Sequence, residues 1–573
     1  MKSDEILKRE LMRKDIKVFR FVRCMPTATK LYIATLSLSL IPAFFYTSPA
    51  FEDGLGTMAA AAYLAGYDWS DFLASDGYYY KYGQSLWYLL PFSLIPHAVL
   101  RYRVMLIINS VLTSFIPVLA WRIAEGKLHT EKRTAFLIAF LTGIYPPILL
   151  YSKYTWAETN LMVLPWVCLL LLLKIYGIEE KHRNRDSIFL AAAVAYAFMS
   201  HQRGMVLILA VTLTLVCLQF TLRRMSCMRC VSHSAIPYDE KNGIFWPAYL
   251  LTLGAGLLAD SILSGWQKAY VYAGAVMEHN TLRDFLQPEL YRKLLSAKGL
   301  RVVLDTAVGW LFHSGASTFG CAFLGLLFMI GVVWRWLRGQ ERQEYGYLVV
   351  SLLGFFCYFG ALALGLLFFF QDLYGYFDGS RVERCDHLLF GRYLESSVPI
   401  LLFLGLTVLW GGKKGAVRRK DNDDMNFVGV ETIRTDSMDD KASGWRLRWM
   451  ALSLDVCVTL AMAFRLLPLM DHVSCYVHSL MALNLFMDTS DITGTLDVIP
   501  NYAEALAAFG VLSLLIFIFL LCARGKKGRR CSAVVLCILF LWIYVYNSVT
   551  VTGRVDGCGE SRYAEVYLNC SIK

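Results

Sequence analysis

Runs of apolar residues, each about 20 residues long, recur along this chain from residue 30 to residue 549. A segment of that length can cross a bilayer as an α-helix, because a helix satisfies its own backbone hydrogen bonds inside lipid. We therefore expect an all-α polytopic membrane protein. The pattern predicts thirteen transmembrane helices, at about 30–49, 103–122, 134–151, 158–175, 187–200, 203–221, 245–263, 316–336, 345–369, 394–410, 446–464, 504–523 and 530–549.

A fourteenth apolar run, 84–100, is short for a span and contains Pro91, Pro96 and His97. If this run lies on the membrane surface, the loops rich in lysine and arginine fall on one side of the membrane. The loops on the other side are mostly poor in these residues; the loop 50–83, for example, contains only Lys81. Because cytoplasmic loops collect basic residues, the pattern favours thirteen spans, a cytoplasmic N-terminus and an extracytoplasmic C-terminus. The long outer loop between the seventh and eighth predicted spans is an exception, since it holds six basic residues.

The loops divide the chain into five predicted parts. A basic cytoplasmic N-terminus (1–29) precedes a transmembrane module (30–410), and a disordered cytoplasmic linker (411–445) precedes a three-helix transmembrane part (446–549) and an extracytoplasmic tail (550–573). The main outer loops of the module are 50–102, 264–315 and 370–393. Apolar residues at helical spacing in outer loops predict helices that lie in the membrane interface.

The composition narrows the class of protein. Of 573 residues, 57% are hydrophobic and 18% are charged, whereas about a quarter of the residues in soluble domains are charged. These values exclude a soluble enzyme, a nucleic-acid-binding protein, a fibrous protein and a disordered chain. The net charge of +11 fits basic cytoplasmic loops better than a polyanionic partner. We expect a multi-pass protein of the plasma membrane.

Acidic residues at the outer ends of spans are the first candidates for chemistry. Glu52 and Asp53 follow the first span directly, beside glycines and alanines. Partial burial there would raise the pKa of a carboxyl group towards that of a general base. The alternative, which charge alone favours, is a solvated acidic residue that ends a helix. Glu158 begins a span after an aromatic run. It is either a functional ionisable residue or a helix N-terminal residue favoured by the macrodipole.

Basic residues at the same side form a second group of candidates. His201 and Arg203 lie in a very short outer turn, and Arg392 and Tyr393 precede another span. Arginine offers a planar fork that binds two phosphate oxygens, which predicts donor phosphate binding by these residues. The alternative is that the arginine side chains extend to the lipid headgroups and Tyr393 anchors at the interface.

Aromatic and cysteine residues leave further alternatives open. Tyr79, Tyr82 and Trp87, within YYYKYGQSLW, would form either a platform for a sugar or acceptor or an aromatic belt at the membrane interface. Two pairs of outer cysteines, Cys558 with Cys570 and Cys385 with Cys475, are candidates for disulfides, which form only in an oxidising compartment.

Several short motifs follow one another in a characteristic order. After Glu52-Asp53 come LAGYDWS and YYYKYGQSLWYLLPF, then YPPILLYSKYTWAET, SHQRG and GRYLESSVP. Their order and their side of the membrane resemble the GT-C superfamily of membrane glycosyltransferases, whose relatives include protein O-mannosyltransferases and the lipid A aminoarabinose transferase. The resemblance covers about residues 30–410. It implies about a dozen spans, with a catalytic acidic residue and surface-lying helices in the first outer loop.

The resemblance also assigns roles to residues. The family often has adjacent Asp-Glu, whereas this chain has Glu52-Asp53 followed by Gly54. Matching the downstream LGT places Asp53 at the family's Asp position, so Asp53 is the expected general base and Glu52 the second choice. Glu158 matches a second acidic position that would hold the sugar or acceptor. The resemblance likewise favours a phosphate-binding role for the basic residues.

The sequence therefore predicts an integral membrane glycosyltransferase. It would transfer a sugar from a polyprenyl-phosphate-linked donor to an extracytoplasmic glycan, lipid or protein, with inversion and with Asp53 as base. No metal is required, although a divalent cation bridging Asp53 and Glu158 to phosphate is an open alternative. A multi-span transporter or lipid flippase is the first alternative function, and a non-catalytic partner in envelope assembly is the second.

Overall fold

The computed structural model describes residues 25–176, 182–229, 243–276, 287–339, 345–376, 384–411, 438–470, 473–492, 496–523, 525–555 and 561–569. These residues are almost entirely helical, with a single two-stranded sheet among them. The elements up to residue 271 are α2 (Thr27–Leu40), η1 (Ile41–Phe44), α3 (Glu52–Leu64), α4 (Ser70–Asp76), η2 (Gln84–Tyr88), α5 (Leu89–Leu94), α6 (Ala98–Thr113), α7 (Phe115–Gly126), α8 (Lys132–Gly143), α9 (Pro146–Tyr151), α10 (Glu158–Ile175), α11 (Arg183–Ser200), α12 (Gly204–Arg229), α13 (Trp246–Trp266) and η3 (Gln267–Val271).

The second half of the chain continues the helical pattern. Its elements are α15 (Pro288–Leu294), α16 (Ala297–Ala316), α17 (Cys321–Leu337), α18 (Tyr345–Tyr376), η4 (Cys385–Leu389), η5 (Gly391–Tyr393), α19 (Val398–Trp410), α20 (Met438–Ala461), η6 (Met462–Leu466), η7 (Leu467–Leu469), β1 (Ser474–Tyr476), η8 (Val477–Leu480), β2 (Leu496–Val498), α21 (Tyr502–Cys522), α22 (Gly525–Thr550), η9 (Val551–Val555) and α24 (Ser561–Asn569).

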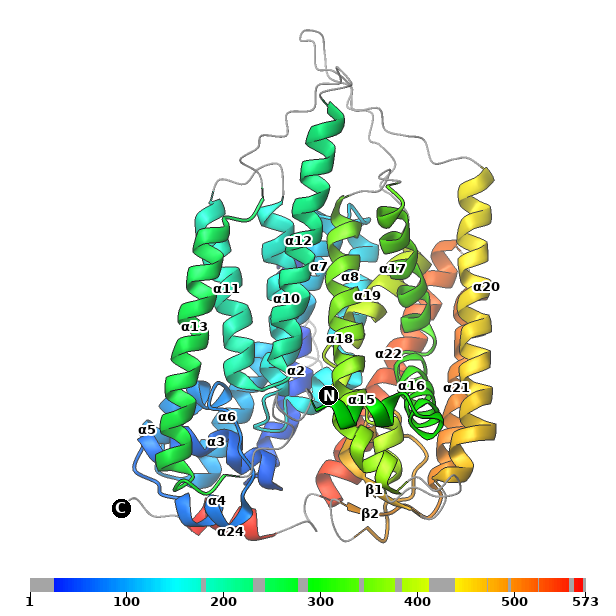
Figure 1. Cartoon of the computed structure of the whole chain (residues 1–573). Coiled ribbons are helices and arrows are strands. Elements are labelled where there is room, and N and C mark those ends of the chain that lie inside the picture. Colours follow the sequence, from blue (N-terminus) through cyan, green and yellow to red (C-terminus); the bar gives the residue numbers. More distant parts are fainter. Residues whose placement is uncertain are drawn as a thin grey trace, which may run out of the picture.

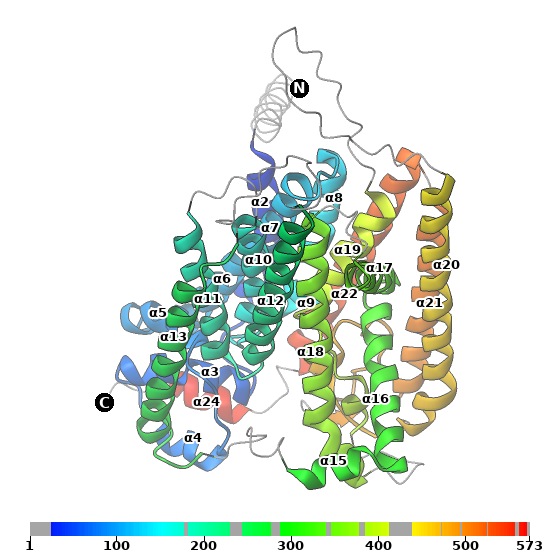
Figure 2. The ribbon, with the colours of Figure 1, turned by 45° about the horizontal axis from the view of Figure 1, so that its top comes forward.

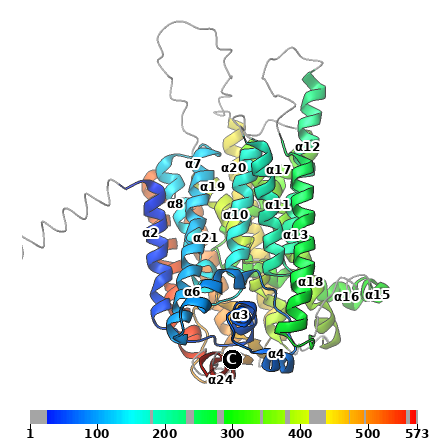
Figure 3. The ribbon, with the colours of Figure 1, turned by 90° about the vertical axis from the view of Figure 1, so that its left-hand side faces the viewer.

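Long apolar helices run side by side as one bundle (Figures 1 and 3). Among the described residues, nine helices are long and apolar enough to cross a membrane, and a tenth span is added if α16 and α17, which meet at 111°, count as one. The chain is thus an all-α polytopic membrane protein, as predicted. The nine are Thr27–Phe44, Ala98–Gly126, Glu158–Ile175, Gly204–Arg223, Trp246–Val271, Tyr345–Gly375, Gly444–Leu469, Tyr502–Cys522 and Gly525–Arg554.

The predicted count of thirteen spans is not confirmed in the described part of the chain. The run 134–151 divides into α8 and α9, and Pro146, which lacks an N–H donor, begins the second helix. Helix α11 carries three charged residues in its first turn: Arg183, Arg185 and Asp186. Helix α19 has 13 residues, about 20 Å of helix, which is shorter than a hydrocarbon core of about 30 Å.

The ambiguous run 84–100 does not cross the bundle. It forms the short helices η2 and α5 before α6 begins at Ala98. These helices lie beside α3 at the lower end of the bundle in Figure 1. The elements α4, α15, β1, β2 and α24 lie at the same end. The loops predicted to be external therefore gather at one end. Figure 2 shows that α24, the last helix, also lies beside α3.

Residues 473–492 and 496–498 connect the C-terminal part of the chain to this same end. Strands β1 and β2 pair antiparallel, with Cys475 opposite Asp497, and Arg384 forms a further bridge to Ser474. Helices η4 and η8 also lie in contact. The segment before α19 and the loop after α20 are thereby held together next to α3.

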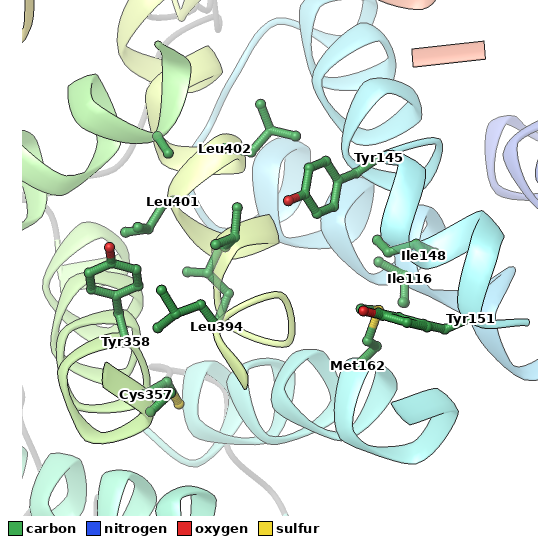
Figure 4. Packing of buried hydrophobic residues seen from close by; sticks show 14 of the residues in the cluster. Ile116, Tyr145, Ile148, Tyr151, Met162, Cys357, Tyr358, Leu394, Leu401 and Leu402 are labelled. Carbon is green, nitrogen blue, oxygen red and sulfur yellow. The ribbon is translucent and has the colours of Figure 1, made fainter. Parts of the chain in front are cut away.

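Buried side chains from α7, α9, α10, α18 and α19 fill the centre of the bundle (Figure 4). Tyr151 lies beside Met162, and Leu394 and Leu401 face Tyr358 (Figure 4). Helices α17 and α19 approach so closely that a Cβ on Gly325 would lie 2.0 Å from the Leu401 carbonyl oxygen. Small residues permit such contacts between helices in membranes.

Replacing Gly325 with alanine is expected to lower the stability of the protein. The added methyl group would overlap the backbone of α19, and overpacking of this kind costs about 1–3 kcal/mol. Gly331→Ala is the matched control, because it lies on the same helix with no atom within 4 Å of the added Cβ. The measurement is the midpoint of thermal unfolding in detergent. Equal midpoints for the two variants would contradict the close packing of α17 and α19.

Candidate functional site

Glu52 and Asp53 form the first turn of α3, after Phe51 in extended conformation. Acidic residues at this position interact favourably with the helix dipole. The rest of α3 consists mainly of glycine and alanine, so neighbouring segments approach its backbone closely. Thr155 donates a hydrogen bond of 3.0 Å to the Gly54 carbonyl, and the Thr57 hydroxyl lies 2.7 Å from the Thr155 carbonyl. These contacts fix the start of α3 against the segment that leads into α10.

Arg392 brings two of the predicted acidic residues together. Its Nη1 forms an ion pair with Asp53, and its Nε donates a hydrogen bond of 2.5 Å to Glu158. The guanidinium group also lies over the Trp156 ring, 4.1 Å from the centroid. Burial alone would lower the pKa of Arg392, but the charges of Asp53 and Glu158 outweigh this and hold the pKa well above its ordinary value.

Arg203 completes what we call the carboxylate–guanidinium cluster: Asp53, Glu158, Arg203 and Arg392. Arg203 pairs with Glu158 and donates a hydrogen bond of 3.0 Å to the Arg392 carbonyl, and it lies over the Tyr393 ring at 4.8 Å. Two positive and two negative charges thus balance. The exposed side-chain fractions are 20% for Asp53 and 3% for Glu158, so Asp53 is the carboxylate that solvent reaches.

His201 supports the turn rather than adding charge to the cluster. Its Nδ1 accepts a hydrogen bond of 3.1 Å from the Arg203 backbone N–H. Burial, followed by the positive charge of Arg203, lowers the pKa of His201 well below its usual value. The imidazole is therefore neutral at pH 7, and it can bind a phosphate only through a hydrogen bond.

Glu52 has a different environment from Asp53. The Tyr80 hydroxyl donates a hydrogen bond of 2.9 Å to Glu52 Oε1. Tyr80 reaches this position because residue 56 is glycine, where a Cβ would lie 2.1 Å from the Tyr80 ring. Burial and then the negative charge of Asp53 raise the pKa of Glu52 to about 8. Glu52 is thus neutral at pH 7.

Wild type is expected to lose stability between pH 5 and pH 8 relative to Glu52→Gln. In this window the carboxyl group is protonated in the folded protein, with a pKa of about 8, but ionised in the unfolded chain, which has a pKa near 4.5. Unfolding releases a proton, so the free energy of unfolding falls as pH rises. Glutamine cannot ionise, and it removes this slope. Unfolding midpoints measured at pH 5 and pH 8 check the prediction, and parallel profiles would contradict it.

The aromatic candidates of the first outer loop contact other elements than the cluster. Tyr79 donates a hydrogen bond of 3.0 Å to Gln267 at the end of α13, and Trp87 donates one of 3.1 Å to Asn160. Tyr82 is buried. Lys81, between them, pairs with Asp260 at 2.7 Å. These contacts attach the segment to α10 and α13, and the platform role of Tyr79, Tyr82 and Trp87 stays a prediction.

The structure adds aromatic neighbours that the sequence did not single out. Phe51, which precedes Glu52, packs on Trp156 and on His478, with ring centroids 5.0 and 4.6 Å apart. Residue 478 follows β1, so the C-terminal part of the chain contributes one wall of the site. Trp156 could have been noticed from its place two residues before Glu158, whereas no local signal marks His478. Of the predicted cysteine pairs, Cys558, Cys570 and the Cys385 side chain lie outside the described residues.

A narrow groove with an accessible volume of about 30 Å³ lies beside Arg203 and Tyr393. Arg203, Tyr393, Ser396 and Ser397 form its polar end. Its remaining walls are apolar and come from three helices, α10, α12 and α18: Leu161, Pro165, Val206, Leu207, Cys357, Ala361 and Leu364. Within the described residues, the buried Arg203 Nε and Glu158 Oε2 have no hydrogen-bond partner. The polar end of the groove therefore holds one donor group able to bind an anion.

The described residues contain no group of three or more His, Cys, Asp or Glu side chains able to hold a metal ion. Between Asp53 and Glu158, the position predicted for a bridging cation, lies the guanidinium group of Arg392. The two carboxylates thus already share one positive charge.

Comparison with known proteins gives a structural likeness only. No protein-family model matches the chain, and no curated protein sequence matches it. Two solved structures of ArnT from Cupriavidus metallidurans are similar to it. The structure bound to undecaprenyl phosphate has 12% sequence identity and a TM-score of 0.42, and the match covers 92% of this chain and 77% of that one. The apo structure has 11% identity and a TM-score of 0.41, with coverage of 92% and 76%.

Proposed function

We propose that the chain is an integral membrane glycosyltransferase that moves a sugar from a polyprenyl-phosphate-linked donor to an extracytoplasmic acceptor. One observation carries the proposal: a cluster of two carboxylates and two arginines meets an apolar groove at the end of the bundle that holds the outer loops. Such a site suits an amphiphile with an anionic head.

The donor phosphate binds at Arg203 and Arg392, and the isoprenoid chain enters between α10, α12 and α18, where the groove of about 30 Å³ widens as the chain binds. Two features support this placement. Arg203 Nε is a buried donor without a partner among the described residues, and a phosphate oxygen would satisfy it. The groove walls beyond Arg203 are apolar and belong to candidate spans, so a hydrocarbon chain there stays out of water.

Asp53 acts as the general base. It takes the proton of the acceptor hydroxyl, the hydroxyl oxygen bonds to the anomeric carbon, and the bond from that carbon to the phosphate oxygen breaks. The bonding electrons leave with polyprenyl phosphate, and the single displacement inverts the anomeric centre. The donor diester carries one negative charge and the product monoester close to two. Protonation of Asp53 gives the cluster a net charge of +1 at the moment when the leaving group becomes more negative.

Donor binding also frees the base. In the structure Asp53 is paired with Arg392, which occupies the carboxylate that must accept the proton. A phosphate bound to Arg392 competes for the same guanidinium edge and releases Asp53. Glu158 has little exposure and contacts both arginines, so it keeps them in place while the donor binds and reacts. The acceptor then reacts only after the donor is bound.

The site faces the extracytoplasmic side in this proposal. Basic residues at the opposite end of the described helices, such as Lys132, Arg183, Arg338 and Arg529, fit cytoplasmic loops. With this orientation the proposal assigns the N-terminus to the cytoplasm and the C-terminus to the outside. It also assigns this multi-pass membrane protein to the plasma membrane.

Transfer is expected to persist after removal of divalent metal ions. Arg392 supplies positive charge between the two carboxylates, where a bridging cation would otherwise lie. Transfer rates measured with and without EDTA check this. Loss of activity in EDTA that added Mg²⁺ or Mn²⁺ restores would favour a bridging cation instead.

A panel of radiolabelled polyprenyl-phosphate sugars, supplied to membranes that contain the wild-type protein, tests the function itself. Membranes that lack the protein are the control. The proposal predicts label in an acceptor fraction for at least one donor. Absence of transfer from every donor would contradict it and favour a transporter or flippase, whereas binding of a partner protein without transfer would favour an assembly role.

A further inference from the structure

We propose that Glu395 is a positioning residue that sets the place of Arg392, and that it acts together with Tyr151 and His313. This inference rests on the proposed function, because it assigns a role in donor binding. Glu395 is buried, three residues beyond Arg392. It touches neither Asp53 nor Glu158 in any contact that the structure shows, so its effect passes through Arg392.

Two side chains bind the Glu395 carboxylate from different helices. The Tyr151 hydroxyl, at the end of α9, donates a hydrogen bond to Oε2, and His313 Nε2, near the end of α16, lies 3.1 Å from Oε1. All three side chains are at most 2% exposed. A carboxylate buried this deeply is costly unless its oxygens are satisfied, so the three groups hold one another in a defined arrangement.

The Glu395 backbone closes the turn that carries Arg392. The Glu395 and Leu394 N–H groups both donate to the Gly391 carbonyl, at 3.0 and 2.8 Å. His313 packs directly on the start of this turn, since a Cβ on Gly391 would lie 1.9 Å from the imidazole Cε1. The imidazole therefore contacts both ends of the turn: the Gly391 backbone by packing and the Glu395 carboxylate by a hydrogen bond.

The same network supports the guanidinium group of Arg392. Trp156 lies under that group at 4.1 Å, and the Tyr151 ring packs on Trp156 with centroids 5.9 Å apart. Tyr151 thus connects the surface beneath the guanidinium to the carboxylate that closes the turn. Side-chain contacts thus connect Glu395 to Arg392 through Tyr151 and Trp156. The backbone of the turn from residue 391 to residue 395 connects the same two residues a second time. Moving Glu395 would shift the Arg392 side chain and its backbone together.

The test measures the affinity of the purified full-length protein for polyprenyl phosphate in lipid nanodiscs. In Glu395→Gln, the amide cannot accept hydrogen bonds from both Tyr151 and His313. Loss of a hydrogen bond to a charged group corresponds to an affinity loss of about tenfold to a hundredfold. Tyr151→Phe removes only the hydroxyl and keeps the ring against Trp156, so it tests the network even if the first variant does not fold.

A double-mutant cycle with Arg392→Lys separates positioning from general destabilisation. If Glu395 acts through Arg392, Glu395→Gln changes the affinity less than about twofold once Arg392 is lysine. Asp305→Asn is the control, because it also removes a buried carboxylate. Asp305 lies on α16 and binds Arg465 at 2.8 Å. We expect it to lower stability without changing affinity.

Two results would overturn the inference alone while the proposed function stands: an equal effect of Glu395→Gln in both backgrounds, or unchanged affinity in both Glu395→Gln and Tyr151→Phe. Absence of polyprenyl phosphate binding by wild type would overturn the proposed function and this inference with it.

Discussion

Asp53→Asn abolishes sugar transfer but leaves donor binding at least as strong as in wild type: this is the largest expected effect. Asparagine keeps the size of the side chain and cannot take a proton, and a general base contributes about a hundredfold to ten-thousandfold to a rate. Arg392 loses one of its two carboxylate partners, so its guanidinium group becomes more available to phosphate. The measurements are the transfer rate and the affinity for polyprenyl phosphate, at matched expression.

Glu52→Gln is the control for this experiment. Glu52 is already neutral at pH 7, because its pKa is raised to about 8, so the variant should keep most of the transfer activity. Full activity in Asp53→Asn would remove Asp53 from the mechanism. Loss of activity in Glu52→Gln alone would make Glu52 the base.

Arg392→Lys has the second largest expected effect, a fall in kcat/KM of about a hundredfold to a thousandfold. Lysine carries the charge but cannot bind Asp53 and Glu158 at once with a planar fork, and it loses the stacking on Trp156. Both the KM for donor and kcat should change, since the arginine binds phosphate in the ground state and stabilises the leaving group. Steady-state kinetics with varied donor concentration measure the two.

Arg465→Lys is the matched control for Arg392→Lys. Arg465 binds Asp305 through two hydrogen bonds of 3.2 and 2.8 Å, in a pair between α16 and η6 that shares no residue with the cluster. The same substitution there should leave kcat/KM unchanged. An equal loss in both variants would show that the effect of Arg392→Lys comes from destabilisation rather than from the site.

The hydrophobic pattern predicted the class of fold because transmembrane helices are defined by length and apolarity alone. The count of thirteen spans is not confirmed where a helix is short or polar, as in α19 and α11. Neighbouring helices cover α19, whereas α11 exposes Ile188 and Phe189. That 84–100 does not span could be predicted from charge. If it spanned, every later loop would change sides and the basic loops would no longer lie on the cytoplasmic side.

The members of the cluster could be named from the sequence as candidates, but their contacts could not. Asp53, Glu158, Arg203 and Arg392 were each candidates, yet their pairing depends on segments up to 339 residues apart in the chain. Glu395 lies inside the motif GRYLESSVP and still gave no signal, because its role depends on a tyrosine and a histidine from other helices. Contacts between distant segments depend on how the helices pack, and the local sequence pattern does not specify that packing.

The most direct test of the proposed donor site is a cryo-electron microscopy structure of the full-length protein with polyprenyl phosphate in nanodiscs. We expect phosphate oxygens within about 3 Å of the guanidinium nitrogens of Arg203 and Arg392, the isoprenoid chain between α10, α12 and α18, and Asp53 no longer paired with Arg392. A phosphate bound elsewhere, or an intact pair between Asp53 and Arg392 with the lipid bound, would contradict the proposed site.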